Sequence, residues 1–283
     1  MTITTVGVVG CGLMGSGIAQ VAAQSGYTTI VREASDDLLQ QGLDRIRRFL
    51  AGGVQRGKLT EDEKHRTLNR IIGITQFEEF HACDIVIEAV TENPAVKKDV
   101  FTSLDRALPP HALIATNTSS ISITELAATT QRPGKVIGLH FFNPVPIMPL
   151  IEMVIGLTTS EETIGIARQF GESLGKKIIV AKDTPGFIVN YLLIPYLLDA
   201  VRLVESGTAT KEDIDAGMTL GCSHPIGPLA LLDLIGLDTT LYIADVLYEG
   251  FRAEKYAIPP LLRKMVAAGY LGRKSGRGFY EYT

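Results

Sequence analysis

The beginning of the chain restricts its fold more than any other part of the sequence. Ile3–Val9 is an unbroken β-branched run, and Gly10–Gly15 follows it at once with the pattern G-x-G-x-x-G. The next residues, Met14–Gln24, have the composition of a helix. A strand that enters a helix through a glycine-rich turn is the first half of a βαβ unit, which predicts a parallel sheet.

The same alternation continues through the first half of the chain. Short apolar segments predict further strands at Tyr27–Val31, Ile85–Glu88, Leu113–Ala115 and Val136–Leu139. Helical stretches lie between several of them, most clearly at Ala95–Leu108. This order predicts an α/β domain with a Rossmann-type, doubly wound sheet that carries helices on both faces.

Residues 36–70 interrupt the alternation with a long, charged and helical segment. Its apolar residues lie at helical spacing: Leu38, Leu39, Leu43, Ile46, Phe49 and Leu50. Gly52-Gly53 predicts a break, and a second helix is expected from Thr60. We therefore expect an antiparallel helix pair inserted between two strands of the sheet.

The second half of the chain changes character after Val180. Asp183–Gly186 has the composition of a turn. Beyond it the pattern predicts helices at Phe187–Ser206, Lys211–Thr219, Pro228–Gly250 and Pro259–Ala267. Because 283 residues suit roughly two domains, we expect a sheet domain at residues 1–183 and an all-helical domain at residues 184–283.

Composition and charge exclude several classes of protein. A formal charge of −4 argues against an extended nucleic-acid surface. The apolar stretches are too short to span a membrane, and the N-terminus lacks the pattern of a signal peptide. Cys11, Cys83 and Cys222 are too scattered for a disulfide framework or a metal site. We therefore expect a soluble cytoplasmic protein without a metal.

The glycine motif has the chemistry of a dinucleotide site. Gly10 permits the tight turn, Gly12 lets backbone N–H groups approach a pyrophosphate, and Gly15 allows close packing of helix on strand. Glu33, after the next strand, would accept hydrogen bonds from a ribose and repel a 2′-phosphate. These features favour NAD, although Arg32 could tolerate the 2′-phosphate of NADP.

A histidine and a glutamate form the candidate catalytic pair. His140 ends a β-like run and is therefore expected at the carboxyl edge of the sheet, where such folds bind ligands. Glu152 lies in a second apolar run, Leu150–Ile155, where a carboxylate needs a partner. If the Asn143–Pro149 turn folds the second run back, Glu152 would orient the imidazole of His140 as a general base.

Two further polar sites admit more than one interpretation. Asn117–Ser120 follows a strand, so that a hydroxyl there could bind a substrate oxygen or cap the helix expected near Ile123–Ala127. Ser122 or Thr124 could supply that cap instead. Asn190 lies in an apolar helix, where a buried amide must bond either backbone or a ligand.

Taken together, the motifs resemble those of the L-3-hydroxyacyl-CoA dehydrogenase family, and most closely its short bacterial 3-hydroxybutyryl-CoA members. The resemblance covers essentially the whole chain. It rests on Gly10–Gln20, Ile87–Ala89 with Glu92-Asn93, Asn117–Ser120, Leu139–Pro144, Asp183–Asn190, His224–Pro228 and Gly272–Tyr280.

The resemblance implies an oxidoreductase that converts an L-3-hydroxyacyl-CoA reversibly to the 3-ketoacyl-CoA with NAD. It implies that His140 is the base, that Glu152 pairs with it, and that Ser119 and Asn190 hold the substrate oxygen. The cofactor residues that it implies are Gly10, Gly12, Leu13, Met14, Gly15, Glu33, Glu92, Lys97, Asn117, Ser119, Asn143 and Lys274. It also implies a homodimer formed through the helical domain.

Substrate range stays open at this point. Glu33 replaces the usual aspartate, Pro149 stands where many relatives carry lysine, and Ala230 stands where glutamate is common. Arg45, Arg47, Arg48, Arg56 and Lys58 could meet the phosphates of CoA or form a solvated basic face. Three alternatives to a short-chain 3-hydroxyacyl-CoA dehydrogenase stay open. The substrate could be of the 3-hydroxyadipyl-CoA type or a free hydroxy acid, or the protein could bind a dinucleotide and have lost the catalytic activity.

Overall fold

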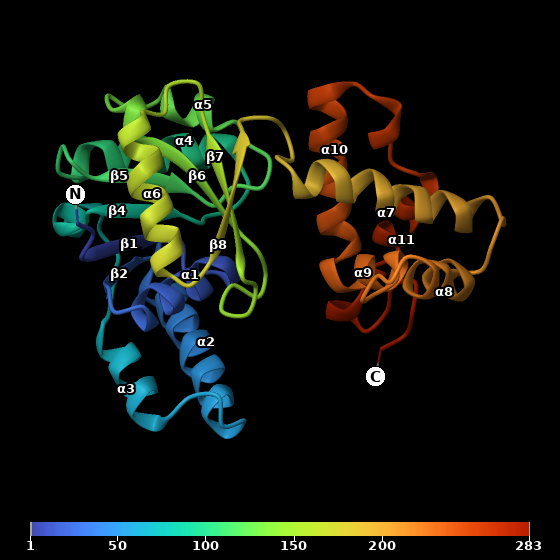
Figure 1. Cartoon of the computed structure of the whole chain (residues 1–283), viewed down its shortest axis with the longest axis horizontal. Coiled ribbons are helices and arrows are strands. Elements are labelled where there is room, and N and C mark those ends of the chain that lie inside the picture. The colour runs from blue at the N-terminus through green and yellow to red at the C-terminus, as the bar shows by residue number, and fades with distance from the viewer. Residues whose placement is uncertain (1, 283) are drawn as a thin grey trace. The chain divides into compact units, whose positions relative to one another are not determined.

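The computed structural model describes residues 2–282 of the chain. The chain divides into two compact units, Met1–Thr184 and Pro185–Thr283. The first unit is built around a sheet and the second consists of helices (Figure 1). We describe each unit by itself.

An eight-stranded sheet with the order β3-β2-β1-β4-β5-β6-β7-β8 forms the centre of the first unit. The strands are β1 (Thr5–Val9), β2 (Thr28–Arg32), β3 (Ile71–Ile74), β4 (Ile85–Glu88), β5 (Leu113–Thr116), β6 (Val136–Phe141), β7 (Leu150–Ile155) and β8 (Lys177–Lys182). The strands from β3 to β6 are parallel, β7 is antiparallel to β6, and β8 is parallel to β7. The sequence predicted the parallel sheet correctly but missed β3 and β8.

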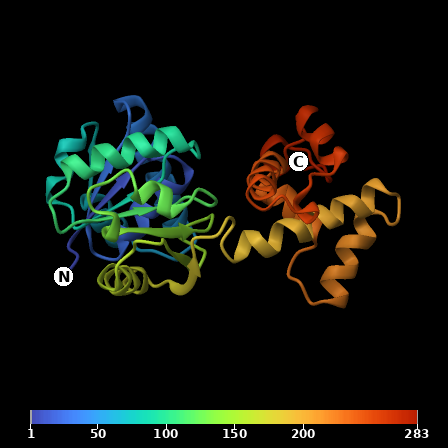
Figure 2. The same cartoon turned by 90° about the horizontal axis from the view of Figure 1, so that it is seen from above.

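Helices cover both faces of this sheet. They are α1 (Leu13–Gln24), α2 (Asp36–Gln55), α3 (Glu61–Asn69), α4 (Pro94–Ala107), α5 (Ile123–Ala127) and α6 (Glu161–Ser173). Ile18 of α1 and Phe170 of α6 belong to one apolar core. Figure 2 shows α4, in blue-green, on the opposite face from α6, in yellow-green. The fully buried runs of β4 and β5 follow from this double cover.

The strand order reverses between β1 and β4, which are neighbours in the sheet. The chain leaves β1 toward β2 on one side and later returns to β4 on the other. In open α/β sheets this reversal opens a crevice at the carboxyl ends of the strands, where ligands bind. The residues that follow β1, β2, β4, β5 and β6 therefore share one edge of the sheet.

The helix pair predicted for residues 36–70 consists of α2 and α3, which extend beyond the sheet in Figure 1. The break predicted at Gly52-Gly53 was wrong, because α2 continues through both glycines to Gln55. Burial of Ile46 and Leu50 stabilises the helix up to that point. The chain turns at Gly57, whose φ of +65° suits glycine.

The second unit contains five α-helices among its described residues. They are α7 (Val189–Glu205), α8 (Lys211–Gly221), α9 (Pro228–Ile235), α10 (Leu237–Phe251) and α11 (Pro260–Ala267). The single helix predicted for Pro228–Gly250 was wrong: Gly236, with φ +106°, separates α9 from α10. An apolar cluster that includes Leu197, Leu232 and Leu247 holds these helices together.

Asp233 fastens the C-terminal segment onto the helices of the second unit. Its buried carboxylate accepts hydrogen bonds from the backbone N–H groups of Phe279 and Tyr280 and from the hydroxyl of Tyr282, each at 2.9 Å. Gly278 leaves room for this carboxylate, because a Cβ there would lie 2.0 Å from Asp233 Oδ1.

Among residues 2–282, no helix has both the length and the apolar character that crossing a bilayer requires.

We predict that Asp233→Ala destabilises the helical unit by about 3 kcal/mol, because it leaves buried donors without an acceptor. The control Asp199→Ala removes an exposed ion pair to Arg202 and should cost less than about 1 kcal/mol. Urea unfolding followed by tyrosine fluorescence measures this, since Tyr27 alone among the nine tyrosines precedes Pro185. Equal losses in the two variants would contradict the role of Asp233.

Candidate active site

The glycine motif forms a tight turn between β1 and α1. Gly10 has φ +90°, and a Cβ there would lie 2.7 Å from the carbonyl oxygen of Ala89. A Cβ on Gly15 would lie 1.7 Å from the carbonyl oxygen of Gly10. Gly12 differs, because no described atom other than those of Gly12 and its two chain neighbours lies within 4 Å of its Cβ position. Backbone atoms of the protein therefore leave no room for a side chain at Gly10 or Gly15. The space beside Gly12 is open, and this motif places a pyrophosphate close to the backbone there.

The N-terminus of α1 adds a favourable field for an anion at the same turn. Gly12 is the N-cap, it supplies no side-chain hydrogen bond, and the first turn of the helix carries no acidic residue. The first N–H groups of a helix lack partners within it and carry partial positive charge. These donors, with Leu13 and Met14 in the first turn, fit the phosphates of a dinucleotide.

Glu33 lies beside the turn, directly after β2. Its Oε1 accepts a hydrogen bond of 2.6 Å from the N–H of Cys11, and its Oε2 accepts one of 3.0 Å from the N–H of Ala34. The carboxylate is therefore held against the glycine turn, where a ribose of the bound dinucleotide is expected.

Arg32 is engaged elsewhere. Its Nε donates to the carbonyl oxygen of Thr75 at 3.1 Å, and its guanidinium lies 4.2 Å from the ring centroid of Phe77. The arginine that could have met a 2′-phosphate thus packs on the segment after β3.

Helix α2 packs on the other side of the turn. Arg45 donates to the carbonyl oxygen of Cys11 at 3.0 Å and therefore supports the turn. The sequence had left open whether this arginine meets CoA phosphates or belongs to a solvated basic face. Gly42 leaves room for the thiol of Cys11, because a Cβ there would lie 2.3 Å from Sγ. Burial, with a smaller contribution from Glu33, raises the pKa of Cys11 to about 12, so the thiol stays protonated.

His140 and Glu152 meet as the antiparallel pairing of their strands requires. They are directly opposite in the register of β6 and β7, and His140 Nδ1 lies 2.7 Å from Glu152 Oε2. Glu152 is fully buried and His140 is 7% exposed. The predicted return of the chain after Asn143 is confirmed. A buried carboxylate at Nδ1 fixes the orientation of the imidazole ring.

The loop between β6 and β7 contains Asn143, which is exposed and precedes a cis bond to Pro144, and Lys176 holds the loop. The ammonium of Lys176 donates to the carbonyl oxygens of Val145 at 2.7 Å and Met148 at 2.8 Å. Val145 packs against Gly17 of α1, where a Cβ would lie 2.9 Å from it. The histidine hairpin and the dinucleotide helix therefore pack directly against each other.

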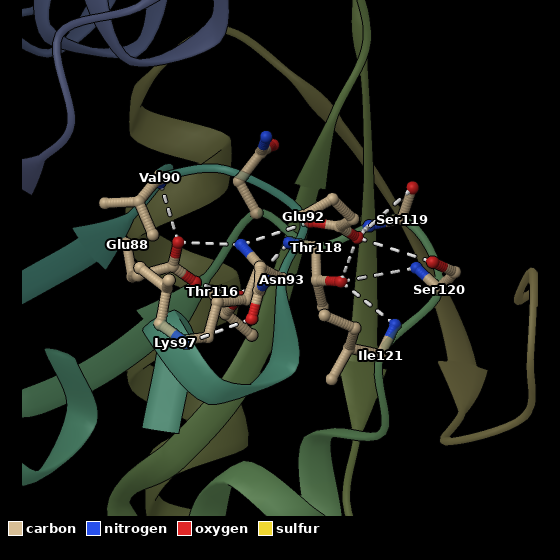
Figure 3. Close-up of polar contacts among 12 residues, drawn as sticks. Glu88, Val90, Glu92, Asn93, Lys97, Thr116, Thr118, Ser119, Ser120 and Ile121 are labelled. Atoms are coloured by element: carbon tan, nitrogen blue, oxygen red, sulfur yellow. Dashed lines mark hydrogen bonds and ion pairs between the residues drawn. The ribbon is translucent and has the colours of Figure 1, made fainter. Parts of the chain in front are cut away.

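The segment Asn117–Ser120 follows β5, and the carboxylate of Glu92 accepts several hydrogen bonds from it (Figure 3). Glu92 Oε1 accepts from the hydroxyl of Thr118, from the N–H of Ser119 at 2.9 Å, and from the hydroxyls of Ser119 and Ser120 at 3.4 Å. Ser122 caps α5, so these hydroxyls are not needed as its cap. Asn117 Oδ1 accepts from the N–H of Phe141 at 2.9 Å and ties this segment to β6.

Lys97 lies under this segment and is 1% exposed. Its Nζ lies 3.1 Å from Glu92 Oε2 and 2.7 Å from Glu88 Oε1. Burial raises the pKa of Glu92, but the charge of Lys97 and the hydrogen bonds from Thr118 and Ser119 outweigh it and hold the pKa below its usual value. Sequence reasoning assigned no role to Glu88, although a carboxylate at the end of a buried strand was a signal for one.

Two of the predicted site residues lie in the second unit. Asn190 is buried in the first turn of α7. Lys274 lies in the short helical turn Arg273–Ser275, and its ammonium is 2.6 Å from the carboxylate of Asp238. The predicted residues of the first unit thus gather at the carboxyl edge of the sheet, while these two belong to the helical unit.

A dinucleotide cradle beside a buried histidine–carboxylate pair is typical of dehydrogenases that transfer a hydride to or from a nicotinamide cofactor. Comparisons with known proteins narrow this class. Residues 5–184 match the model of the 3-hydroxyacyl-CoA dehydrogenase NAD binding domain, and residues 186–282 match that of the 3-hydroxyacyl-CoA dehydrogenase C-terminal domain.

Individual relatives match over the full length. The chain is 49% identical over 282 residues to the 3-hydroxybutyryl-CoA dehydrogenase of Mycobacterium tuberculosis, covering 99% of each chain. It is 49% identical to the probable 3-hydroxybutyryl-CoA dehydrogenase of Bacillus subtilis, covering 100% of this chain and 98% of the other. The solved (S)-3-hydroxybutyryl-CoA dehydrogenase of Ralstonia eutropha is 48% identical, with a TM-score of 0.95 and full coverage of both chains. The chain belongs to the 3-hydroxyacyl-CoA dehydrogenase family, and its first unit is the NAD-binding domain of that family.

The contrast between Gly12 and Gly15 predicts two different defects. Gly12→Ala should weaken NADH binding by about tenfold, because a methyl group enters the space of the pyrophosphate, while the melting temperature stays within about 2 °C of wild type. Gly15→Ala should lower both the affinity for NADH and the melting temperature, because its Cβ collides with the carbonyl of Gly10. NADH fluorescence titration and thermal melting measure these effects. Unchanged NADH affinity in Gly12→Ala would contradict the placement of the pyrophosphate.

Proposed function

We propose that this protein catalyses the reversible, NAD-dependent oxidation of L-3-hydroxybutyryl-CoA, and of related short-chain 3-hydroxyacyl-CoA thioesters, to the 3-ketoacyl-CoA. The observation that carries the proposal is the buried pair of His140 and Glu152, whose Nδ1 and Oε2 are 2.7 Å apart. It lies at the sheet edge that also holds the glycine turn. The names of the full-length relatives support the choice of substrate.

In this mechanism His140 moves one proton. Nδ1–H donates to Glu152, so Nε2 carries the lone pair that accepts the proton of the C3 hydroxyl. NAD, when bound, would supply the nicotinamide ring as the acceptor of the hydride from C3 of the substrate. Glu152 stabilises the imidazolium that results, and its buried position prevents water from competing for the ring. In the reverse direction the imidazolium returns the proton to the ketone oxygen.

The remaining residues bind and orient. Ser119 would donate a hydrogen bond to the substrate oxygen, and the side chain of Asn190 would bind the substrate. Glu33 would hold the ribose of NAD, while Glu92, Lys97, Asn117, Asn143 and Lys274 would support the cofactor side. The segment Asn117–Ser120 is tied to β6 through Asn117, which supports a role near His140.

We further propose that the protein acts in the cytoplasm as a homodimer. The matched C-terminal domain of the family, residues 186–282, would supply the substrate contacts and the dimer interface. Gel filtration with light scattering tests the dimer.

We expect His140→Gln to lower kcat by about 10³-fold, because it removes proton transfer. The Kd for NADH should stay within about threefold, since the histidine does not hold the dinucleotide. His111→Gln, which replaces a half-exposed histidine at the opposite edge of the sheet, is the matched control and should leave kcat unchanged. Near-normal turnover of His140→Gln would overturn the assignment of the base.

Substrate and cofactor class are tested by steady-state reduction of acetoacetyl-CoA and free acetoacetate, each with NADH and NADPH. We expect kcat/KM to favour the thioester and NADH by at least about 10²-fold, because CoA and Glu33 contacts contribute binding energy. Equal efficiency with the free acid would indicate a hydroxy-acid dehydrogenase. NADH binding without any turnover would indicate a protein that has lost the chemistry.

A further inference from the structure

Glu88 is a fully buried carboxylate that the mechanism above does not use. It ends β4, at the same sheet edge as the glycine turn. Its Oε1 accepts from Lys97 Nζ and from the N–H of Val90, each at 2.7 Å, and its Oε2 accepts from the hydroxyl of Thr116 at 2.7 Å. Every one of these contacts is internal, so Glu88 is built into the protein rather than exposed for a ligand.

Lys97 shares its single charge between two carboxylates, those of Glu88 and Glu92. The three groups carry a net charge of −1. Burying charges is costly unless each one is paired and hydrogen-bonded. Removal of the cation would leave two carboxylates without compensation, whereas removal of Glu88 alone would leave a neutral pair.

Two routes lead from Glu88 to the segment that carries Ser119 (Figure 3). The first runs through Lys97 to Glu92, which accepts from the backbone N–H of Ser119 at 2.9 Å. The contact from the Ser119 hydroxyl is longer, at 3.4 Å, and leaves the hydroxyl proton available for a substrate oxygen. The second runs through the hydroxyl of Thr116, which accepts from the N–H of Thr118 at 3.1 Å. Both routes constrain the backbone that sets the direction of the Ser119 hydroxyl.

We infer that Glu88 is a positioning residue for the reaction, acting through Lys97 and Glu92 to hold the Ser119 hydroxyl where the substrate oxygen binds. This inference rests on the proposed function for the role of Ser119. The orientation of Ser119 then depends on a buried charge balance, and not only on the local turn.

A double-mutant cycle of Glu88→Gln and Lys97→Met tests the coupling. Glu88→Gln should lower kcat by about tenfold, with the KM for NADH within about twofold of wild type, and Lys97→Met should lower kcat by about a hundredfold. The double variant should be more active than Lys97→Met, because it buries one carboxylate fewer without a cation. A purely structural role would not give this compensation together with a change confined to kcat.

Lys98→Met is the matched control. Lys98 is the next residue on α4, and it forms an exposed pair with Glu125 at 3.2 Å, so kcat should not change. The inference would be overturned if the fold-loss in kcat of the double variant equalled the product of the two single losses. A kcat of Glu88→Gln within about twofold of wild type would also overturn it.

Thermal melting separates this inference from the proposed function. The double variant should melt above Lys97→Met even without substrate, since the coupling exists in the free protein. If wild type shows no turnover, the proposed function fails, and the melting order alone supports or overturns the coupling. If Lys97→Met does not fold, the kcat of Glu88→Gln decides: a loss of at least about fivefold supports the inference, and a loss below about twofold overturns it.

Discussion

A buried carboxylate is stable only where donors meet it, and this constraint organises the carboxyl edge of the sheet. The half-buried carboxylate of Glu33 accepts from the N–H of Cys11 in the glycine turn and from the N–H of Ala34. Glu88 and Glu92 share Lys97, and Glu152 meets His140. Each carboxylate fixes a different part of the edge, so the binding and reacting groups are oriented before any ligand arrives.

Glycine makes this crowding possible at two positions in particular. Gly15 allows α1 to approach the turn after β1, and Gly17 allows the loop after β6 to approach α1. The dinucleotide helix and the hairpin of His140 are thereby packed together. Distant parts of the chain meet at one edge because small residues permit close approach where side chains would keep the elements apart.

Much of the fold could be predicted, because hydrophobic periodicity and the glycine motif are local signals. Such reasoning was wrong where tertiary packing outweighed local preference. Helix α2 continues past Gly52-Gly53 because its buried apolar face stabilises it. The sequence also missed Ile71–Ile74 and Lys177–Lys182, since short segments with exposed residues lack the pattern of a buried strand.

The sequence by itself predicted the parallel sheet and the dinucleotide turn, because hydrophobic alternation and glycine spacing are local patterns. It predicted the pairing of His140 with Glu152 only on the condition that the chain turns back after Asn143. Only the tertiary structure decided which partners the other charged side chains of the sheet edge bind. It turned Arg32 and Arg45 onto backbone carbonyls and joined Glu88 to Lys97. Such choices depend on which buried groups come within hydrogen-bond distance after the strands have assembled, and a linear pattern carries no information about that.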